Sequence, residues 1–138
     1  MDLTHDRVRE LFAHLEAGDG ERFFAAVADD VNWTIEGVQP VAGTYTSKSA
    51  FIEGAIARLG AIFQASPRFE VQHVFVDGDT AIVEMRTVST VDLRGVPFES
   101  PYCWVCRFAD DKIVEARAYL DSATVAYFLS ANDVRRRT

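Results

Sequence analysis

The chain has 138 residues with a formal net charge of −7, and 49% of its residues are hydrophobic, so it suits one folded domain and is too apolar for a disordered chain. The acidic balance argues against binding to nucleic acid and against docking on an anionic membrane. The N-terminus lacks the pattern of a signal peptide and no stretch approaches the ~20 apolar residues that span a bilayer, so we expect a cytoplasmic protein with reduced thiols.

The first half of the chain is predicted to be mainly helical. Apolar residues recur at helical spacing over residues 5–17, which predicts an amphipathic helix. A second, short helix is expected after Asp19 and is predicted to end at the acidic pair 29–30. A third helix is predicted to begin after Ser47, a good N-cap residue, and to stop before Pro67.

The second half of the chain is predicted to be a sheet. Residues 31–37 are rich in β-formers and predict a first strand, followed by a turn-rich connection over residues 38–45. From Phe69 onward the apolar period changes to two, which predicts strands joined by short turns. These strands are expected at residues 68–76, 80–93, 100–109 and 112–121, with a closing helix at 122–129. We therefore predict an α+β fold class, in which three N-terminal helices cover a curved antiparallel sheet made of a four-strand meander plus an N-terminal strand.

No internal repeat, low-complexity segment or linker divides the chain. We expect a single domain over residues 1–138, with its core at about residues 4–130 and a tail at 131–138. The basic run Arg135–Arg137 in this tail is expected to be solvated.

Both cysteines lie in the stretch SPYCWVCRF, residues 100–108, at C-x-x-C spacing. In a strand, Cys103 and Cys106 point to opposite faces, and roughly 10 Å separates their Cα atoms, beyond the ~7 Å limit for a disulfide. A redox C-x-x-C motif normally opens a helix, which this stretch does not resemble. A zinc site needs about four ligands, and the three histidines are widely scattered. We therefore expect no redox or metal site, and expect Cys106 to face the core as a small hydrophobe.

Alternation along the strands predicts which side chains face the helices. Two of the inward residues are large aromatic side chains, and two on the neighbouring strand are alanines. Small residues at the centre of a concave sheet, rimmed by aromatic ones, predict a cavity under the helices. The alternative is that a side chain from the third helix, such as Phe51, fills this space. The inward residues of interest are Met85, Thr87, Tyr102, Trp104, Ala116 and Ala118.

The order of these elements and three short motifs resemble a known family. The motifs are ADDVNW at residues 28–33, the G-x-Y of Gly43–Tyr45 before the third helix, and KIVEARAYLD at residues 112–121. Over roughly residues 4–130 the chain resembles the SnoaL-like branch of the nuclear transport factor 2 superfamily, which also includes ketosteroid isomerase and limonene epoxide hydrolase. The resemblance implies a cone-shaped, cystatin-like domain with a deep apolar pocket, and a homodimer formed through the outer sheet face. It implies no particular reaction, because this fold hosts enzymes and non-enzymes alike.

The catalytic carboxylates of two related enzymes have no counterpart at the matching positions. The epoxide-hydrolase type has an Arg and an Asp on the long strand and an Asp on the last strand, where this chain has Met85, Thr87 and Ala118. The isomerase type has a base on the first strand and an acid on the third strand of the meander, where this chain has Ile35 and Trp104. The resemblance therefore supports neither of these two reactions.

Two other residues are candidate general bases. His73 is in phase with Phe69 and Phe75, and on the inward face it could act as a base or orient a ligand; the alternative is a structural histidine. Asp121 ends the last strand, where it could act as a base at the cavity mouth or cap the following helix. Aromatic side chains and a threonine could donate hydrogen bonds to a ligand carbonyl. The predicted ligand-binding set is Trp33, Tyr45, Phe51, Met85, Thr87, Tyr102, Trp104, Ala116 and Ala118.

The sequence leaves two functions open. The first is a pocket for a small hydrophobic molecule of polyketide-like, steroid-like or terpenoid-like structure. If it is catalytic, this pocket would run isomerase, cyclase, hydrolase or lyase chemistry on a carbonyl compound, with His73 or Asp121 as base and Tyr45 or Tyr102 as donor. The second is a non-catalytic dimeric module with a vestigial pocket that binds a metabolite or a protein partner. SnoaL-like relatives act without a metal or an organic cofactor, so the resemblance implies none.

Overall fold

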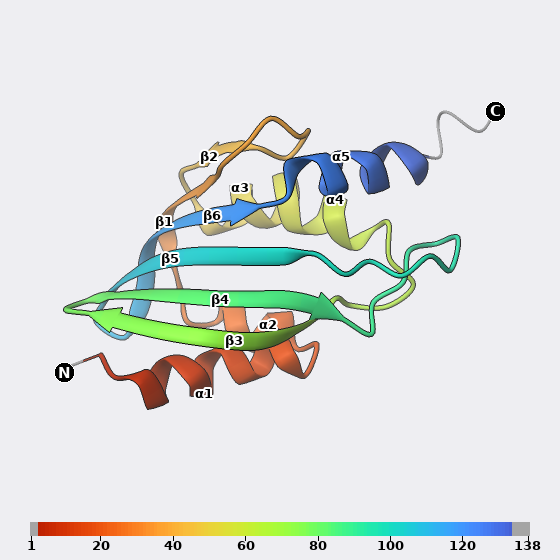
Figure 1. The fold of residues 1–138 in the computed structure, drawn as a ribbon. Helices are drawn as coiled ribbons and strands as arrows, with labels where there is room; N and C mark the ends of the chain where they lie inside the picture. Colours follow the sequence, from red (N-terminus) through yellow and green to blue (C-terminus); the bar gives the residue numbers. More distant parts are fainter. Residues whose placement is uncertain (1–2, 134–138) are drawn as a thin grey trace.

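A curved six-stranded sheet forms the centre of the fold (Figure 1). The computed structural model describes residues 3–133, so the predicted basic tail at residues 135–137 lies outside the described residues. The strands are β1 (Val27–Ile35), β2 (Gly43–Tyr45), β3 (Arg68–Asp77), β4 (Thr80–Val88), β5 (Pro101–Ala109) and β6 (Lys112–Leu120). Their order is β2-β1-β6-β5-β4-β3, and neighbouring strands are antiparallel except β1 and β6, which run parallel. The predicted α+β class and the meander β3–β6 are confirmed.

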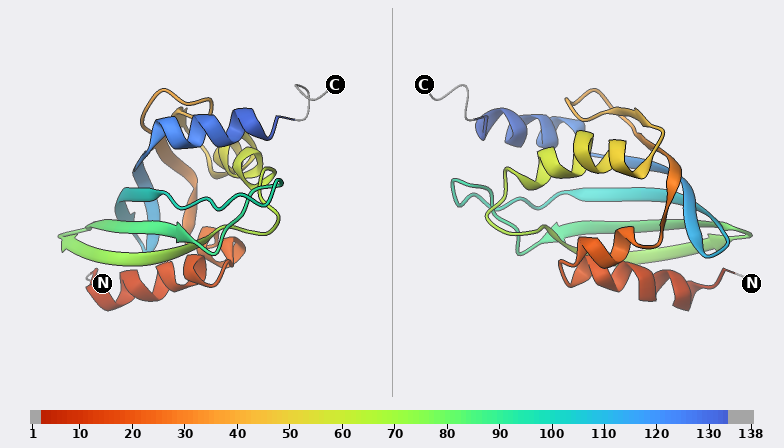
Figure 2. Two further views of the ribbon diagram at one scale, coloured as in Figure 1. Left: turned by 45° about the vertical axis from the view of Figure 1, so that its right-hand side comes forward. Right: turned by 180° about the vertical axis from the view of Figure 1, so that it is seen from behind.

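The helices pack on the face of the sheet that carries the two tryptophans. They are α1 (His5–Glu16), α2 (Gly20–Phe24), α3 (Lys48–Phe51), the π-helical turn η1 (Ile52–Ile56), α4 (Ala57–Gly60) and α5 (Ser122–Ala131). Phe12 of α1 and Phe23 of α2 contact Trp104, while Phe51 of α3 stacks on Trp33. Helix α1 runs along β3, and α5 lies beside the helical segment 48–60 (Figures 1 and 2).

Four helices begin with a side-chain cap. The side chains of Thr4, Asp19, Ser47 and Asp121 each accept a hydrogen bond from the backbone N–H three residues later. Each cap satisfies one of the N–H groups that a helix start leaves without an intrahelical partner. The predicted starts after Thr4, Asp19 and Ser47 are confirmed. The third helix, which comprises α3, η1 and α4, ends at Gly60 and not just before Pro67.

Three features of the strands differ from prediction. Helix α2 ends at Phe24, and the acidic pair 29–30 lies exposed within β1, because β1 already pairs with β6 at Val27. The predicted connection 38–45 contains β2, which pairs with the end of β1. Strand β4 ends before Ser89, whose φ of +48° leaves the extended conformation.

A β-bulge in β3 reverses the predicted orientation of His73. Val71 pairs with Met85 and His73 pairs with the next residue, Glu84, so Gln72 is the extra residue of the bulge. Val74 is therefore buried and His73 exposed. The prediction that His73 is in phase with Phe69 is wrong, because one inserted residue moves every later side chain of the strand to the other face.

The two cysteines lie within β5, as predicted, and both are free. Cys106 is fully buried in the core, and burial raises its pKa to about 12. Burial, with a smaller contribution from the charge of Glu84, also raises the pKa of Cys103. Among residues 3–133 no group of His, Cys, Asp and Glu could hold a metal ion, and no helix combines the length and apolar character that a membrane crossing needs.

Candidate functional site

An apolar cavity of about 360 Å³ lies between the sheet and the helices. This volume is in the range of small-molecule pockets, roughly 300–1,000 Å³. Its wall combines β1 and the four meander strands with α1, α2, the helical segment 48–60 and residues 65–67. None of the described residues that line it carries a charge. This uncharged space is therefore suited to the body of an apolar molecule.

Packed aromatic rings form one wall of the cavity. Trp33 stacks on Phe51, with ring centroids 4.4 Å apart and an interplanar angle of 17°. Trp104 meets Trp33 edge to face at 5.2 Å and 89°, and Phe69 lies 6.1 Å from Trp104. Such contacts add to the stability of the wall beyond the area they bury. Rings held in this way can present a preformed surface to a ligand.

Six of the nine predicted ligand-binding residues line the cavity. They are Trp33, Phe51, Thr87, Tyr102, Trp104 and Ala118. The expected contrast between large and small residues is present, because Trp104 pairs with Ala118 across β5 and β6. Phe51 contributes one side of the wall and leaves the space beside Ala118 unfilled. The role of these residues in ligand binding stays a prediction.

The other three predicted residues lie elsewhere. The Tyr45 hydroxyl donates a hydrogen bond of 2.7 Å to the Val41 carbonyl, and its ring packs on Phe51 behind the cavity wall. Met85 and Ala116 face inward as predicted, but each is 1% exposed and packed in the hydrophobic core. Alternation placed these two on the correct face, but it could not tell a core residue from a cavity residue.

Tyr102 supplies a free polar group of the cavity wall, in addition to the hydroxyl of the exposed Ser66. No hydrogen bond among the described residues engages its hydroxyl, and burial raises the pKa of Tyr102. This hydroxyl therefore stays protonated and can donate to a ligand oxygen. By contrast, the Thr87 hydroxyl already donates to the Phe98 carbonyl and accepts from the Ser100 N–H, both at 2.9 Å. The indole nitrogens of Trp33 and Trp104 have no partner among the described residues and are completely covered.

The two predicted bases do not line the cavity. His73 lies on the exposed outer face, where its Nδ1 is 3.2 Å from Glu84 Oε1. Asp121 caps α5, accepting hydrogen bonds from the Thr124 N–H at 3.2 Å and the Thr124 hydroxyl at 2.9 Å. These hydrogen bonds lower the pKa of Asp121. Of the two roles considered for Asp121, a base at the cavity mouth and a cap of the following helix, the structure shows the cap.

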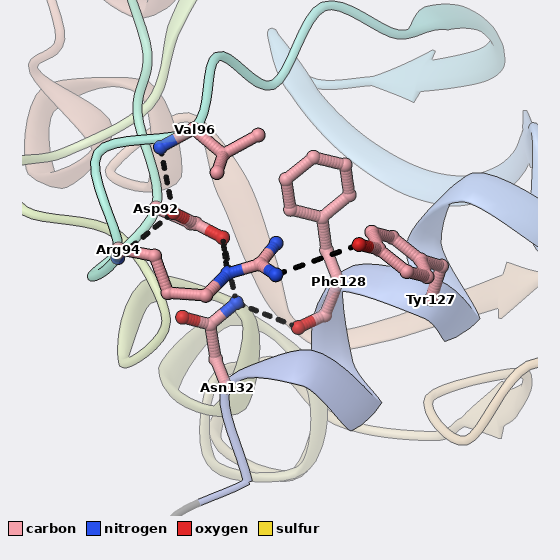
Figure 3. Close-up of polar contacts among 6 residues, drawn as sticks. All are labelled: Asp92, Arg94, Val96, Tyr127, Phe128 and Asn132. Atoms are coloured by element: carbon pink, nitrogen blue, oxygen red, sulfur yellow. Dashed lines mark hydrogen bonds and ion pairs between the residues drawn. The ribbon is translucent and has the colours of Figure 1, made fainter.

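A buried carboxylate joins the loop 89–100 to α5 behind the cavity wall (Figure 3). Asp92 is 0% exposed, and its Oδ1 accepts from the N–H groups of Arg94 and Val96, both at 2.9 Å. Its Oδ2 accepts from Arg94 Nε at 2.8 Å and from Asn132 Nδ2 at 3.0 Å. Burial alone would raise the pKa of Asp92, but the hydrogen bonds from Asn132, Val96 and Arg94 outweigh it and hold the pKa well below its usual range.

This arrangement positions an aromatic part of the cavity wall. Phe98, from the loop that Asp92 anchors, lines the cavity and packs on Phe63 at 5.0 Å and on Phe128 of α5 at 4.9 Å. The sequence prediction missed Asp92 because it extended a strand through residue 93. The sequence pattern that could have revealed this turn is the D-x-x-G of residues 92–95. It is typical of a turn whose aspartate accepts backbone hydrogen bonds.

A second hollow, of about 690 Å³, lies between α1 and the two hairpin turns. It is larger but more open, and charged side chains such as Glu10, Asp79 and Asp110 line it. Arg7 and Asp111, which also line it, form an ion pair at 2.6 Å. The smaller cavity is the candidate site, because it is less open, its lining is uncharged and six of the nine predicted residues line it.

Comparison with known proteins gives a family match and several relatives. The SnoaL-like domain family matches residues 8–116. A curated protein, the dimerizing cyclase phiC of Fungal sp. (strain ATCC 74256), is 28% identical over 131 residues, which is 92% of this chain. The chain spans 57% of the length of that relative.

Solved structures share the fold. An NTF2-like protein from Burkholderia thailandensis E264 superimposes with a TM-score of 0.74 at 28% identity, covering 90% of this chain and 95% of that one. TerC co-crystallized with polyporic acid superimposes with a TM-score of 0.71 at 16% identity, covering 91% of this chain and 96% of that one. At 16% identity the likeness to TerC shows the fold alone.

Proposed function

Because the chain belongs to the SnoaL-like domain family, we propose that its apolar cavity binds a small hydrophobic molecule with a polyketide-like, steroid-like or terpenoid-like skeleton. The observation that carries the proposal is the cavity of about 360 Å³ between sheet and helices, whose described lining is mainly aromatic and aliphatic and carries no charge. Burial of an apolar ligand there is favourable by roughly 25 cal/mol per Å² of apolar surface removed from water. The co-crystallization of TerC with polyporic acid supports ligand binding within this fold.

The cavity would orient its ligand through Tyr102. An apolar wall with few free hydrogen-bond donors, the hydroxyls of Tyr102 and of Ser66 at the rim, selects a ligand that carries an oxygen acceptor on an apolar skeleton. The Tyr102 hydroxyl suits a carbonyl oxygen, because it is protonated and free of intramolecular hydrogen bonds among the described residues. We therefore expect a ketone or quinone group in the ligand.

A fluorescent probe tests the proposed binding. N-phenyl-1-naphthylamine fluoresces on entering an apolar cavity, and we expect saturable binding to the purified protein. In the matched variant Ala118→Phe, a larger side chain enters the space beside Trp104, and probe binding should fall at least tenfold with the fold intact by circular dichroism. Absence of saturable binding to the unmodified protein, or unchanged binding to the variant, would refute the proposal.

Cyclase or isomerase chemistry on a carbonyl compound in the same cavity is a second candidate function. It is favoured by the similarity to a dimerizing cyclase and by the position of the Tyr102 hydroxyl. This hydroxyl would stabilise a developing enolate oxygen, while the wall holds the skeleton in a reactive conformation. No imidazole or carboxylate lines the described cavity, so solvent water or a buffer base would take the proton from the carbon beside the carbonyl and return one at the γ carbon. The chain would contribute positioning and a hydrogen bond from Tyr102 to the enolate oxygen.

A steroid β,γ-enone serves as a probe of oxyanion stabilisation by Tyr102, with a buffer base removing the proton, because the carboxylates of ketosteroid isomerase have no counterpart in this chain. The conversion of this probe into the conjugated enone is followed by absorbance. Tyr102→Phe should lower the rate roughly 10²-fold, whereas His73→Ala and Asp121→Asn should leave it unchanged. A rate that depends on His73 or Asp121 and not on Tyr102 would contradict this assignment.

We also propose that the outer sheet face forms a homodimer, as the resemblance implies. Phe75 and Tyr119 are 52% and 44% exposed on this face, and Arg107 pairs with Glu115 beside them. Light scattering after gel filtration should give twice the chain mass of 15.4 kDa. Phe75→Glu should give the monomer mass, because it buries an unpaired charge in the interface. A monomeric unmodified protein would refute the dimer.

A further inference from the structure

The cavity opens beside the turn that follows α1. Most of its lining is buried or half-buried, but Gly60, Ala65 and Ser66 line it and are exposed to solvent. Gly18 also lines it, and a Cβ atom at Gly18 would lie 4.0 Å from the Ser66 carbonyl oxygen. The α1–α2 turn and the segment after α4 therefore meet at the mouth of the cavity.

Arg68 lies at this mouth. Its Cγ and Nε atoms are 3.6 and 3.8 Å from the position of a Cβ atom at Gly18. The two residues before it, Ser66 and Pro67, line the cavity. The stem and Nε of Arg68 thus lie beside Gly18, which lines the cavity, while Arg68 itself stands just outside the lining.

The charge of Arg68 is not compensated by the part of the chain that the structure describes. Within residues 3–133 no carboxylate forms an ion pair with Arg68, whereas Arg7, Arg22, Lys48 and Arg94 each have one. Arg9, Arg58, Arg86 and Lys112 likewise form no ion pair within the described residues, so the feature that distinguishes Arg68 is its place beside the mouth of an uncharged cavity.

The acidic residues of the adjoining turn are already engaged. Asp19 caps α2 and pairs with Arg22 at 3.4 Å. The Glu16 carboxylate accepts a hydrogen bond of 3.0 Å from the N–H of Val71. These interactions hold both acids to other partners. The guanidinium of Arg68 is therefore available to an anionic group of a ligand.

From this placement we infer that the ligand is an amphipathic organic anion, whose apolar body fills the cavity and whose carboxylate lies against Arg68 at the mouth. The inference rests on the proposed binding function and names its ligand class. A planar guanidinium can form two parallel hydrogen bonds with a carboxylate. The rest of the acidic surface would repel such an anion, so Arg68 would also set the orientation in which it enters.

A pair of probes with one skeleton tests the inference. 8-Anilinonaphthalene-1-sulfonate and N-phenyl-1-naphthylamine share the anilinonaphthalene body, and only the first carries an anionic group, which stands in for the carboxylate. We expect Arg68→Gln to weaken binding of the anionic probe roughly three- to tenfold and to leave the affinity for the neutral probe unchanged. Added salt should reduce the difference in affinity for the anionic probe between the unmodified protein and the variant, because the mouth is exposed to solvent and its charges are screened.

Arg9→Gln is the matched control, because it removes the same charge from an exposed position about 14 Å along α1 from Gly18. It should change neither affinity. If both probes bind and Arg68→Gln weakens them equally or not at all, the anion inference is wrong while the cavity proposal stands. If the unmodified protein binds neither probe, the proposed function fails, and this inference fails with it.

Discussion

Asp92 is a carboxylate that is fully buried, unlike an ordinary surface carboxylate. Both of its oxygens are buried and each accepts two hydrogen bonds, from the turn that it begins and from Asn132 at the end of α5. A buried charge is tolerated only when its hydrogen bonds are complete. This residue therefore couples the loop that carries Phe98 to the last helix.

We expect Asp92→Asn to destabilise the fold by about 1–3 kcal/mol at neutral pH, because an amide cannot accept all four hydrogen bonds. The pKa of Asp92 is lowered from its ordinary value of 3.8, so the ionised group stabilises the fold above that value. This contribution is lost as the pH falls through the lowered pKa. Urea unfolding measures the free energy of unfolding of both proteins. The difference in this free energy between Asp92→Asn and the unmodified protein should shrink below about pH 4. Asp30→Asn, at an exposed position of β1, is the control and should show little difference.

Gly54 permits a close approach between the third helix and Tyr45. A Cβ atom here would lie 2.6 Å from Tyr45 Cε1, whereas nothing lies within 4 Å of one at Gly60. Alanine normally stabilises a helix by about 1 kcal/mol relative to glycine. We expect Gly60→Ala to follow this rule and Gly54→Ala to destabilise the protein by about 1–3 kcal/mol. Thermal unfolding checks both, and equal effects of the two substitutions would contradict the close packing.

At the scale of elements, the bulge in β3 decides which side chains reach the cavity. Before the bulge, Phe69 faces inward and contacts Tyr102 and Trp104. After it, Val74 faces inward, while His73 and Phe75 face out. The same strand therefore contributes an aromatic wall at one end and part of the outer face at the other.

His73→Ala and Phe69→Ala test this reversal. We expect His73→Ala to leave the affinity for N-phenyl-1-naphthylamine unchanged, because the imidazole is on the far face of the sheet. Phe69→Ala should weaken binding severalfold, because it removes a ring from the wall. Fluorescence titration measures both, and a large effect of His73→Ala alone would place the histidine inside.

At the scale of the whole molecule, the cavity is space that the core leaves unfilled. Protein interiors are otherwise packed as densely as organic crystals, and here buried aromatic rings border about 360 Å³ of open volume. Stability alone would favour larger side chains at positions such as Ala118. This open volume is the feature on which the proposed ligand binding rests.

Ligand binding should raise the stability of the whole fold. A probe present at about 100 times its dissociation constant stabilises the native state by about 2.7 kcal/mol. For a chain of 138 residues this corresponds to a rise in Tm on the order of 5–10 °C. Differential scanning calorimetry with N-phenyl-1-naphthylamine should show this rise, and Ala118→Phe should abolish it. An unchanged Tm at saturation would count against binding to the folded state.

The sequence by itself determined the features that depend on a few neighbouring residues. These include the helix starts after Thr4, Asp19 and Ser47, the meander, and the inward orientation of Trp104 and Ala118. Helical and strand periods are properties of the local backbone, so apolar patterning reveals them. The face of the cavity could be predicted for the same reason.

Only the tertiary structure decided which inward residues meet the cavity and which polar groups remain free. The bulge at Gln72 turned His73 outward, and the loop 89–100 engaged the Thr87 hydroxyl. The same loop and α5 together buried Asp92, and the turn at Gly18 brought Arg68 to the mouth. Each outcome depends on a contact with a residue far away in the chain or on one inserted residue. The periodic pattern of apolar residues along the sequence predicts neither of these.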